Sequence, residues 1–122
     1  MSEATSQITG VGRVLVTVAD HDRAIEFYVR TLGFEVRVDG QSPAGRWVEV
    51  APPGAATTLA LVGPQPDGAH VSLTTEDADA DHARLRDCGV DVDAEVMRVG
   101  HGVPPMFTFR DPDGNTVRVV EV

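Results

Sequence analysis

An ordered pattern occurs twice in the chain, and this internal repeat limits the possible folds more than any other feature. In each half a short apolar run is followed by Asp, an amphipathic stretch and Gly. Asp20 and Asp77 lie 57 positions apart, and Gly33 and Gly89 lie 56 positions apart. Asp is a favoured helix N-cap and Gly a favoured residue just beyond the helix end. The repeat therefore predicts two similar strand–helix modules in tandem.

Each predicted helix is preceded by one strand and followed by three. We expect helices over 21–32 and 78–88, and strands over 14–18, 34–39, 46–50, 57–62, 70–75, 90–98, 105–110 and 115–121. Hydrophobic spacing predicts buried faces at Ile25, Val29 and Leu32 in the first helix and at Ala78, Leu85 and Cys88 in the second. This order predicts an α+β fold of two tandem βαβββ modules, with mixed sheets and outer helices. We expect a tail over 1–9 and one domain over 10–122, with modules over about 10–63 and 68–122.

The final hairpin carries the most informative single position. Asp111-Pro112-Asp113-Gly114 has the residue preferences of a tight turn, and alternating apolar residues flank it. In the strand after this turn, alternation places Thr116, Arg118 and Val120 on one face. Whether Arg118 faces the interior or the solvent matters most for the function predicted below.

Composition limits the possible partners. The 122 residues have a formal net charge of −9, which argues against binding to nucleic acid or to anionic membranes. No apolar run approaches the length of a membrane span, and the first residues lack a signal-peptide core. The single cysteine, Cys88, excludes an internal disulfide and suits the cytoplasm. We therefore expect a cytoplasmic protein that binds neither nucleic acid nor membranes.

Three stretches, VLVTVADHDRAIEFYVRTLGFEV, HVSLTTEDADADHARLRDCGVDV and PPMFTFRDPDGN, resemble the vicinal oxygen chelate superfamily. This superfamily includes glyoxalases, bleomycin-resistance proteins and extradiol dioxygenases, and the resemblance covers residues 13–122. It implies that each module forms a half-open cup, with two cups facing each other around a cavity. It also implies a homodimer, in which the cups come from one chain or are exchanged between two.

The same resemblance places metal ligands on the first and last strands of each module. A ligand seven residues before each N-cap corresponds to Arg13 and His70, and one three residues after DPDGN corresponds to Arg118. The fourth position corresponds to Thr58 or Ala60. Of these residues only His70 is a competent ligand, because a guanidinium has no lone pair to offer. A bound Zn²⁺, Fe²⁺ or Mn²⁺ needs about three protein ligands. We therefore expect no metal cofactor, with a divalent metal as the alternative.

The same strand faces supply the candidate ligand-binding residues. Alternation directs Arg13 and Thr17 inward from the first strand, and His70 and Ser72 inward from its counterpart. The full candidate set is Arg13, Thr17, Trp47, His70, Ser72, His101, Phe107 and Arg118. Trp47 and Phe107 could stack on a flat ligand, and His101 lies in a glycine-flanked loop. His21 and His82 are expected on solvated helix surfaces.

Two interpretations of the inward arginines remain open. They could pair with acids such as Glu49, Glu95 or Glu121, or they could hold an anionic group of a ligand with His70 as a third contact.

The sequence leaves three candidate functions open. The first is a metal-free protein that binds or sequesters a small, anionic or aromatic organic molecule. The second is an enzyme, either a metal-dependent lyase, isomerase or dioxygenase or a metal-free acid–base catalyst using His70. The third is a dimeric scaffold with a collapsed cavity.

Overall fold

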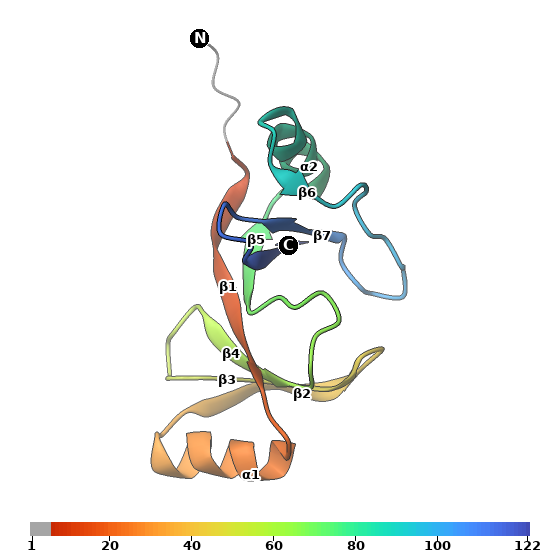
Figure 1. The fold of residues 1–122 in the computed structure, drawn as a ribbon. Helices are drawn as coiled ribbons and strands as arrows, with labels where there is room; N and C mark the ends of the chain where they lie inside the picture. Colours follow the sequence, from red (N-terminus) through yellow and green to blue (C-terminus); the bar gives the residue numbers. More distant parts are fainter. Residues whose placement is uncertain (1–5) are drawn as a thin grey trace. The chain divides into compact units, whose positions relative to one another are not determined.

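The computed structural model describes residues 6–122 and has the predicted α+β organisation (Figure 1). The chain divides into two compact units. The N-terminal unit is Gly12–Gly68, and the C-terminal unit is residues 6–11 together with Ala69–Val122. Strand β1 (Ile8–Thr17) contributes to both units. The tail expected over 1–9 therefore overlaps the start of β1, and its first five residues lie outside the described part.

In the N-terminal unit β1 is followed by a helix and three strands, as the repeat predicts. These elements are α1 (His21–Glu26), its π-helical continuation η1 (Phe27–Thr31), β2 (Glu35–Ser42), β3 (Gly45–Ala51) and β4 (Thr58–Val62). The strand order is β2–β3–β4–β1, in which only β4 and β1 are parallel. Helix α1 lies along one side of this sheet (Figure 1), and Val48, Val50 and Leu61 are buried beneath it.

The C-terminal unit repeats this βαβββ order. Its elements are β5 (Val71–Thr75), α2 (Ala78–Asp87), β6 (Asp91–Val92), β7 (Met106–Arg110) and β8 (Thr116–Glu121). Parallel β5 and β8 lie next to each other, followed by β7 and β6. The core of this unit contains Ala78 from α2 together with Phe107 and Val119 from the sheet.

The predicted helix boundaries are confirmed by their caps. The side chain of Asp20 accepts a hydrogen bond from the backbone N–H of Arg23, and Asp77 accepts one from that of Ala80. Each carboxylate thus satisfies a backbone donor that the first helical turn leaves unpaired. Gly33 has a φ of 76° and Gly89 a φ of 80°, the left-handed conformation that glycine adopts without steric cost.

The first helix differs from its predicted form near its end. Its second half is a π-helical turn, in which the backbone N–H of Leu32 donates to the carbonyl of Phe27 five residues earlier. A π turn contains an extra residue and rotates the following residues away from the α-helical face. Leu32 is accordingly 48% exposed, so the prediction that it is buried was wrong. Ile25 packs against the core, as predicted.

The second helix buries polar residues that the hydrophobic pattern did not identify. Asp81 and His82 are buried whereas Cys88 is exposed, so the predictions for His82 and Cys88 were wrong. The Thr75 hydroxyl and the backbone N–H of Gln7 hydrogen-bond to Asp81, and the His82 ring nitrogen Nε2 lies 2.6 Å from a backbone carbonyl oxygen. These partners remove the cost of burying polar groups. The strand predicted over 90–98 is also shorter, since only Asp91–Val92 forms β6.

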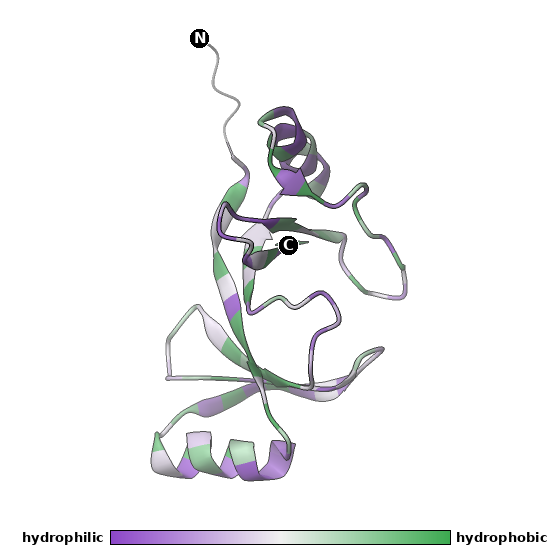
Figure 2. Ribbon diagram, in the orientation of Figure 1, coloured by the Kyte–Doolittle hydropathy of each residue, from purple (hydrophilic) through white to green (hydrophobic). Residues whose placement is uncertain are grey.

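Strand β1 carries both hydrophobic and hydrophilic residues, seen as green and purple bands in Figure 2. Val16 and Val18 pack beneath α1, so Leu15 and Thr17 project from the opposite face of the sheet. Among the described residues no helix is long and apolar enough to cross a membrane.

Candidate ligand-binding face of the N-terminal unit

The candidate residues Arg13, Thr17 and Trp47 lie on the face of the N-terminal sheet that α1 does not cover. Leu15 packs here with Ala60 and Val62, and Trp47 packs against these three buried side chains. Arg13 and Thr17 are two positions on either side of Leu15 along β1, so they project from the same face. The inward face predicted for β1 is therefore the face opposite the helix, which we call the open face.

A buried carboxylate organises the open face. Glu49 is only 9% exposed, and both of its oxygens accept hydrogen bonds. The Thr58 hydroxyl donates to Oε1 and the Trp47 indole Nε1–H donates to Oε2, each at 2.8 Å. The Arg13 guanidinium Nε lies 3.2 Å from the same Oε2 atom. Glu49 therefore holds an arginine and a tryptophan side by side.

The contact between Arg13 and Glu49 is an ion pair without the alignment of a hydrogen bond, since Nε has no hydrogen-bond partner. Within the described residues, Arg13 makes its ion pair with Glu49 through Nε. The terminal nitrogens Nη1 and Nη2, with four N–H donors, are left to solvent or to a ligand. The open face thus presents donors, and each oxygen of Glu49 already accepts one hydrogen bond.

The residues at the expected metal positions do not fit a metal ion. Arg13 and Arg118 carry no lone pair, Ala60 has no donor atom, and the Thr58 hydroxyl is engaged with Glu49. His70 is exposed and precedes β5. Within residues 6–122, no group of three or more His, Cys, Asp or Glu side chains is placed to hold a metal. We therefore derive no chemical step through a metal.

The C-terminal unit has a related polar row on the face opposite its core. Strand pairing places Ser72, Arg118 and Thr108 next to one another across β5, β8 and β7. All three are buried, and in the described part of the chain the Ser72 hydroxyl has no hydrogen-bond partner. The structure thus brings together two of the predicted residues, Ser72 and Arg118, on one face.

Asp93 organises the edge of this polar row and was not identified from the sequence. It accepts hydrogen bonds from the backbone N–H and the hydroxyl of Thr108 and from Arg110. Burial raises the pKa of Asp93, but the hydrogen bonds from Thr108 and Arg110 outweigh it and hold the pKa below its ordinary 3.8. The hydrogen bonds from Arg110 to Asp91 and Asp93 raise the pKa of the guanidinium. No sequence motif identifies Asp93 as a functional residue, because its hydrogen-bond partners Thr108 and Arg110 lie 15 and 17 positions further along the chain.

The remaining candidate residues are not gathered in one place. Phe107 is 1% exposed and packs edge-on against His82 in the core beneath α2, so its ring offers no face for a ligand. This corrects the expectation that Phe107 could stack on a ligand. His101 is exposed in its loop and has a φ of 56°, and Thr17 is exposed on β1.

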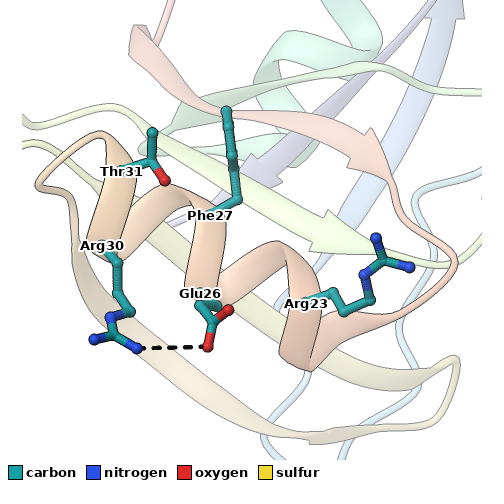
Figure 3. A pocket seen from close by; sticks show the side chains of 5 residues that line it. All are labelled: Arg23, Glu26, Phe27, Arg30 and Thr31. Atoms are coloured by element: carbon teal, nitrogen blue, oxygen red, sulfur yellow. Dashed lines mark ion pairs between the residues drawn. The ribbon is translucent and has the colours of Figure 1, made fainter.

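Two hollows lie away from the open face. One, of about 400 Å³, is on the solvent side of α1 and η1 (Figure 3) and is lined by Arg23, Glu26, Phe27, Arg30 and Thr31. Its ion pair between Glu26 and Arg30 is 3.8 Å long and solvent-exposed, so it contributes little rigidity. The other, of about 430 Å³, lies in the C-terminal unit and is lined by Leu85, Gly89, Val90, Asp91, Phe109, Arg110, Asp111 and Pro112. Neither contains a residue that the sequence singled out for function.

Comparison with known proteins identifies the family. The family model of the Glyoxalase/Bleomycin resistance protein/Dioxygenase superfamily matches residues 10–119. The chain belongs to this superfamily, as its sequence motifs indicated. It is 29% identical over 121 residues to the uncharacterized protein YetH of Bacillus subtilis, covering 93% of this chain and 99% of YetH.

The chain is also similar to solved structures. Methylmalonyl-CoA epimerase from Mycobacterium tuberculosis is similar with a TM-score of 0.80 and 28% identity, covering 98% of this chain and 92% of the epimerase. TnmS3, an antibiotic-binding protein from Streptomyces sp. CB03234, is 39% identical over 93% of this chain and 96% of its own. Its TM-score of 0.47 is too low for the two structures to be compared residue by residue. The epimerase confirms the fold.

Proposed function

We propose that this chain is a small-molecule-binding protein that takes its ligand on the open face of the N-terminal unit without a metal ion. The observation that carries the proposal is the Glu49 cluster. Where the family resemblance expects metal ligands, Arg13 and Thr58 instead contact a buried carboxylate. This cluster places arginine donors and a partly exposed indole on one face, which is the composition of an organic-ligand site rather than of a metal centre.

The exposure of Arg13 favours binding over a collapsed scaffold. A scaffold would pair its arginines completely within a filled core. The Arg13 side chain is 26% exposed, and its ion pair uses one of its three nitrogens. Because Glu49 already holds the Arg13 side chain in place, the arginine loses little conformational entropy when its exposed end binds a ligand.

The proposal is tested by thermal unfolding in the presence of a library of small organic molecules, with and without excess EDTA. A ligand that binds only the folded state raises the melting temperature. We expect stabilising compounds whose effect is the same with EDTA. Stabilisation that disappears with EDTA and returns with Zn²⁺ or Mn²⁺ would refute the metal-free proposal. No stabilising compound at all would support the scaffold alternative.

The likeness to methylmalonyl-CoA epimerase favours a second candidate, an isomerase that acts on an acyl-CoA. Such a reaction would remove and return the proton on the carbon between the carboxylate and the thioester. Incubation with methylmalonyl-CoA in D₂O, followed by NMR, detects this exchange. We expect exchange at the buffer rate, and clear acceleration by the protein would establish the isomerase instead.

We further propose a cytoplasmic homodimer. The N-terminal sheet ends in the edge strand β2, where Val36 and Val38 are each 44% exposed. Exposed apolar residues on an edge strand are a common place for chains to associate. Light scattering after gel filtration should give twice the chain mass of 13.0 kDa, and a mass of one chain would contradict this.

A further inference from the structure

The hollow of the C-terminal unit lies where α2 ends, and we call it the α2-end pocket. It has a volume of about 430 Å³ and is lined by the last turn of α2, the residues after it, the start of β6 and the end of β7 with the turn that follows. Leu85, Val90 and Phe109 supply apolar side chains to this lining. Leu85 and Phe109 also pack against the buried core of the unit, so the floor of the pocket is apolar.

The internal repeat shows how the other unit closes the same place. The offsets of the repeat, 57 residues within the helix and 56 beyond it, equate Tyr28 with Leu85 and Phe34 with Val90. In both units the backbone N–H of the second residue donates to the carbonyl of the first at 3.0 Å, which confirms the correspondence. The rings of Tyr28 and Phe34 lie 5.7 Å apart and pack against the core of the N-terminal unit. The C-terminal unit has aliphatic residues at both positions.

The aromatic ring of the C-terminal unit comes from the sheet instead of the helix end. Phe109 pairs with Val117 as Val50 pairs with Leu59 in the other unit, so a phenyl ring lies where the first module has Val50. Phe109 is only half-buried and forms one wall of the α2-end pocket. A ring that enters from outside would therefore form with Phe109 the kind of ring pair that the N-terminal unit makes internally.

The rim of the pocket is acidic. Asp91 and Asp111 belong to the lining, and hydrogen bonds from Asn115 hold the pKa of Asp111 below its ordinary 3.8. The cation of the lining, Arg110, donates to Asp91 and to Asp93, so its charge is already balanced. The basic residues of the last helical turn are not part of the lining. The rim therefore favours a positively charged ligand.

Asp91 is the carboxylate that can contact a ligand directly. Its side chain is 73% exposed, and Arg110 binds it through Oδ1 at 3.0 Å, which leaves Oδ2 accessible. The oxygens of Asp111 accept hydrogen bonds from the turn that follows it, so Asp111 contributes charge rather than a contact. Because Asp91 follows Val90 directly in the chain, the carboxylate lies at the border of the apolar floor.

We propose that the α2-end pocket binds a primary aryl-alkyl amine as its cation, with the ring against Leu85 and Phe109 and the ammonium group on Asp91. The apolar floor supplies hydrophobic burial, and the carboxylate supplies a charge-assisted hydrogen bond. This is a second site, in the C-terminal unit, and it goes beyond the function proposed for the open face.

Titration with 2-(2-naphthyl)ethylamine, followed by NMR of the protein's N–H groups, tests the proposal. We expect the largest shifts at the backbone amides of Gly89 and Val90 and none at the indole N–H of Trp47, which reports on the open face. The matched probes are 2-(2-naphthyl)ethanol, which keeps the ring and loses the charge, and n-butylamine, which keeps the charge and loses the ring. We expect each to bind at least about fivefold more weakly than the amine.

Two variants, each with a matched control, separate the contributions. Val90→Phe gives the pocket the ring that the N-terminal unit has at this position and should abolish binding while preserving the melting temperature. Its control is Val99→Phe, which adds the same ring at a position that is 49% exposed. Asp91→Asn should lower the affinity for the amine about three- to fivefold and leave that for the alcohol unchanged. Its control is Asp79→Asn, which removes the carboxylate of an exposed Asp–Arg pair in the first turn of α2.

The outcomes distinguish this site from the open face. Equal affinity for the amine and the alcohol would overturn the ligand class, and unchanged affinity in a folded Val90→Phe variant would overturn the pocket. If that variant did not fold, the shifts in the wild-type protein would decide. Shifts centred on the Trp47 indole would overturn the second site and leave the proposed function standing. If none of the three probes bound, the inference would fail without bearing on the open face.

Discussion

Replacing Glu49 by Gln tests the cluster on the open face, because it preserves size and removes only the charge. The carboxylate accepts hydrogen bonds from Thr58 and Trp47 and forms an ion pair with Arg13. A glutamine side chain has a single acceptor oxygen, and its NH₂ group only donates. In the variant the amide oxygen can face Trp47 and Arg13 only if its NH₂ group faces Thr58, whose hydroxyl must then accept instead of donate, and the charge is lost at a position that is 9% exposed.

The expected cost follows from these contacts. A hydrogen bond to a charged group contributes about 1.5–3 kcal/mol. The Arg13 side chain is 26% exposed, so its ion pair is screened and adds at most about 1 kcal/mol. We expect the free energy of unfolding to fall by about 2–3 kcal/mol. In a domain of this size each kcal/mol lowers the melting temperature by roughly 4 °C, which gives a decrease of roughly 8–12 °C.

Thermal unfolding followed by circular dichroism measures this decrease, and Trp47 emission reports whether the indole has lost its acceptor. Glu95→Gln is the control, since Glu95 is exposed and its replacement should change stability by less than about 0.5 kcal/mol. If Glu49→Gln were as stable as Glu95→Gln, with unchanged Trp47 emission, the cluster would not organise the open face.

Three further predictions concern stability. Asp81→Asn should lower the free energy of unfolding by about 2 kcal/mol in chemical denaturation, because buried Asp81 accepts the Thr75 hydroxyl. The lowered pKa of Asp93 means that its stabilisation is complete above pH 3.8 and is lost as pH falls through the lower folded-state pKa. Acid titrations should therefore show a weaker pH dependence below 3.8 for Asp93→Asn than for wild type, and identical curves would contradict this. Gly89→Ala should cost about 1 kcal/mol because of its positive φ, whereas Gly40→Ala should cost nothing, and equal effects would refute this reasoning.

The sequence predicted the fold well because its signals are local. Asp20 and Asp77 begin helices and Gly33 and Gly89 end them, as their capping chemistry requires. Alternation along β1 correctly placed Arg13 and Leu15 on one face. The π turn after Glu26 could not be predicted, because the choice between α and π hydrogen bonding depends on packing rather than on local pattern.

The candidate site was predictable only in part. Arg13 and Trp47 were identified by type and strand face, and Glu49 was one of several acids that could pair with the arginines. That one Glu49 oxygen contacts both residues depends on side-chain geometry across three strands, which spacing along one strand does not contain.

The most direct test of metal-free binding is metal analysis of protein purified without chelator, combined with a ligand-binding isotherm before and after Zn²⁺ is added. We predict far less than one metal ion per chain and an unchanged dissociation constant for whichever compound of the library binds best. One tightly held divalent ion per chain, with binding that is lost on its removal and restored with it, would contradict metal-free recognition.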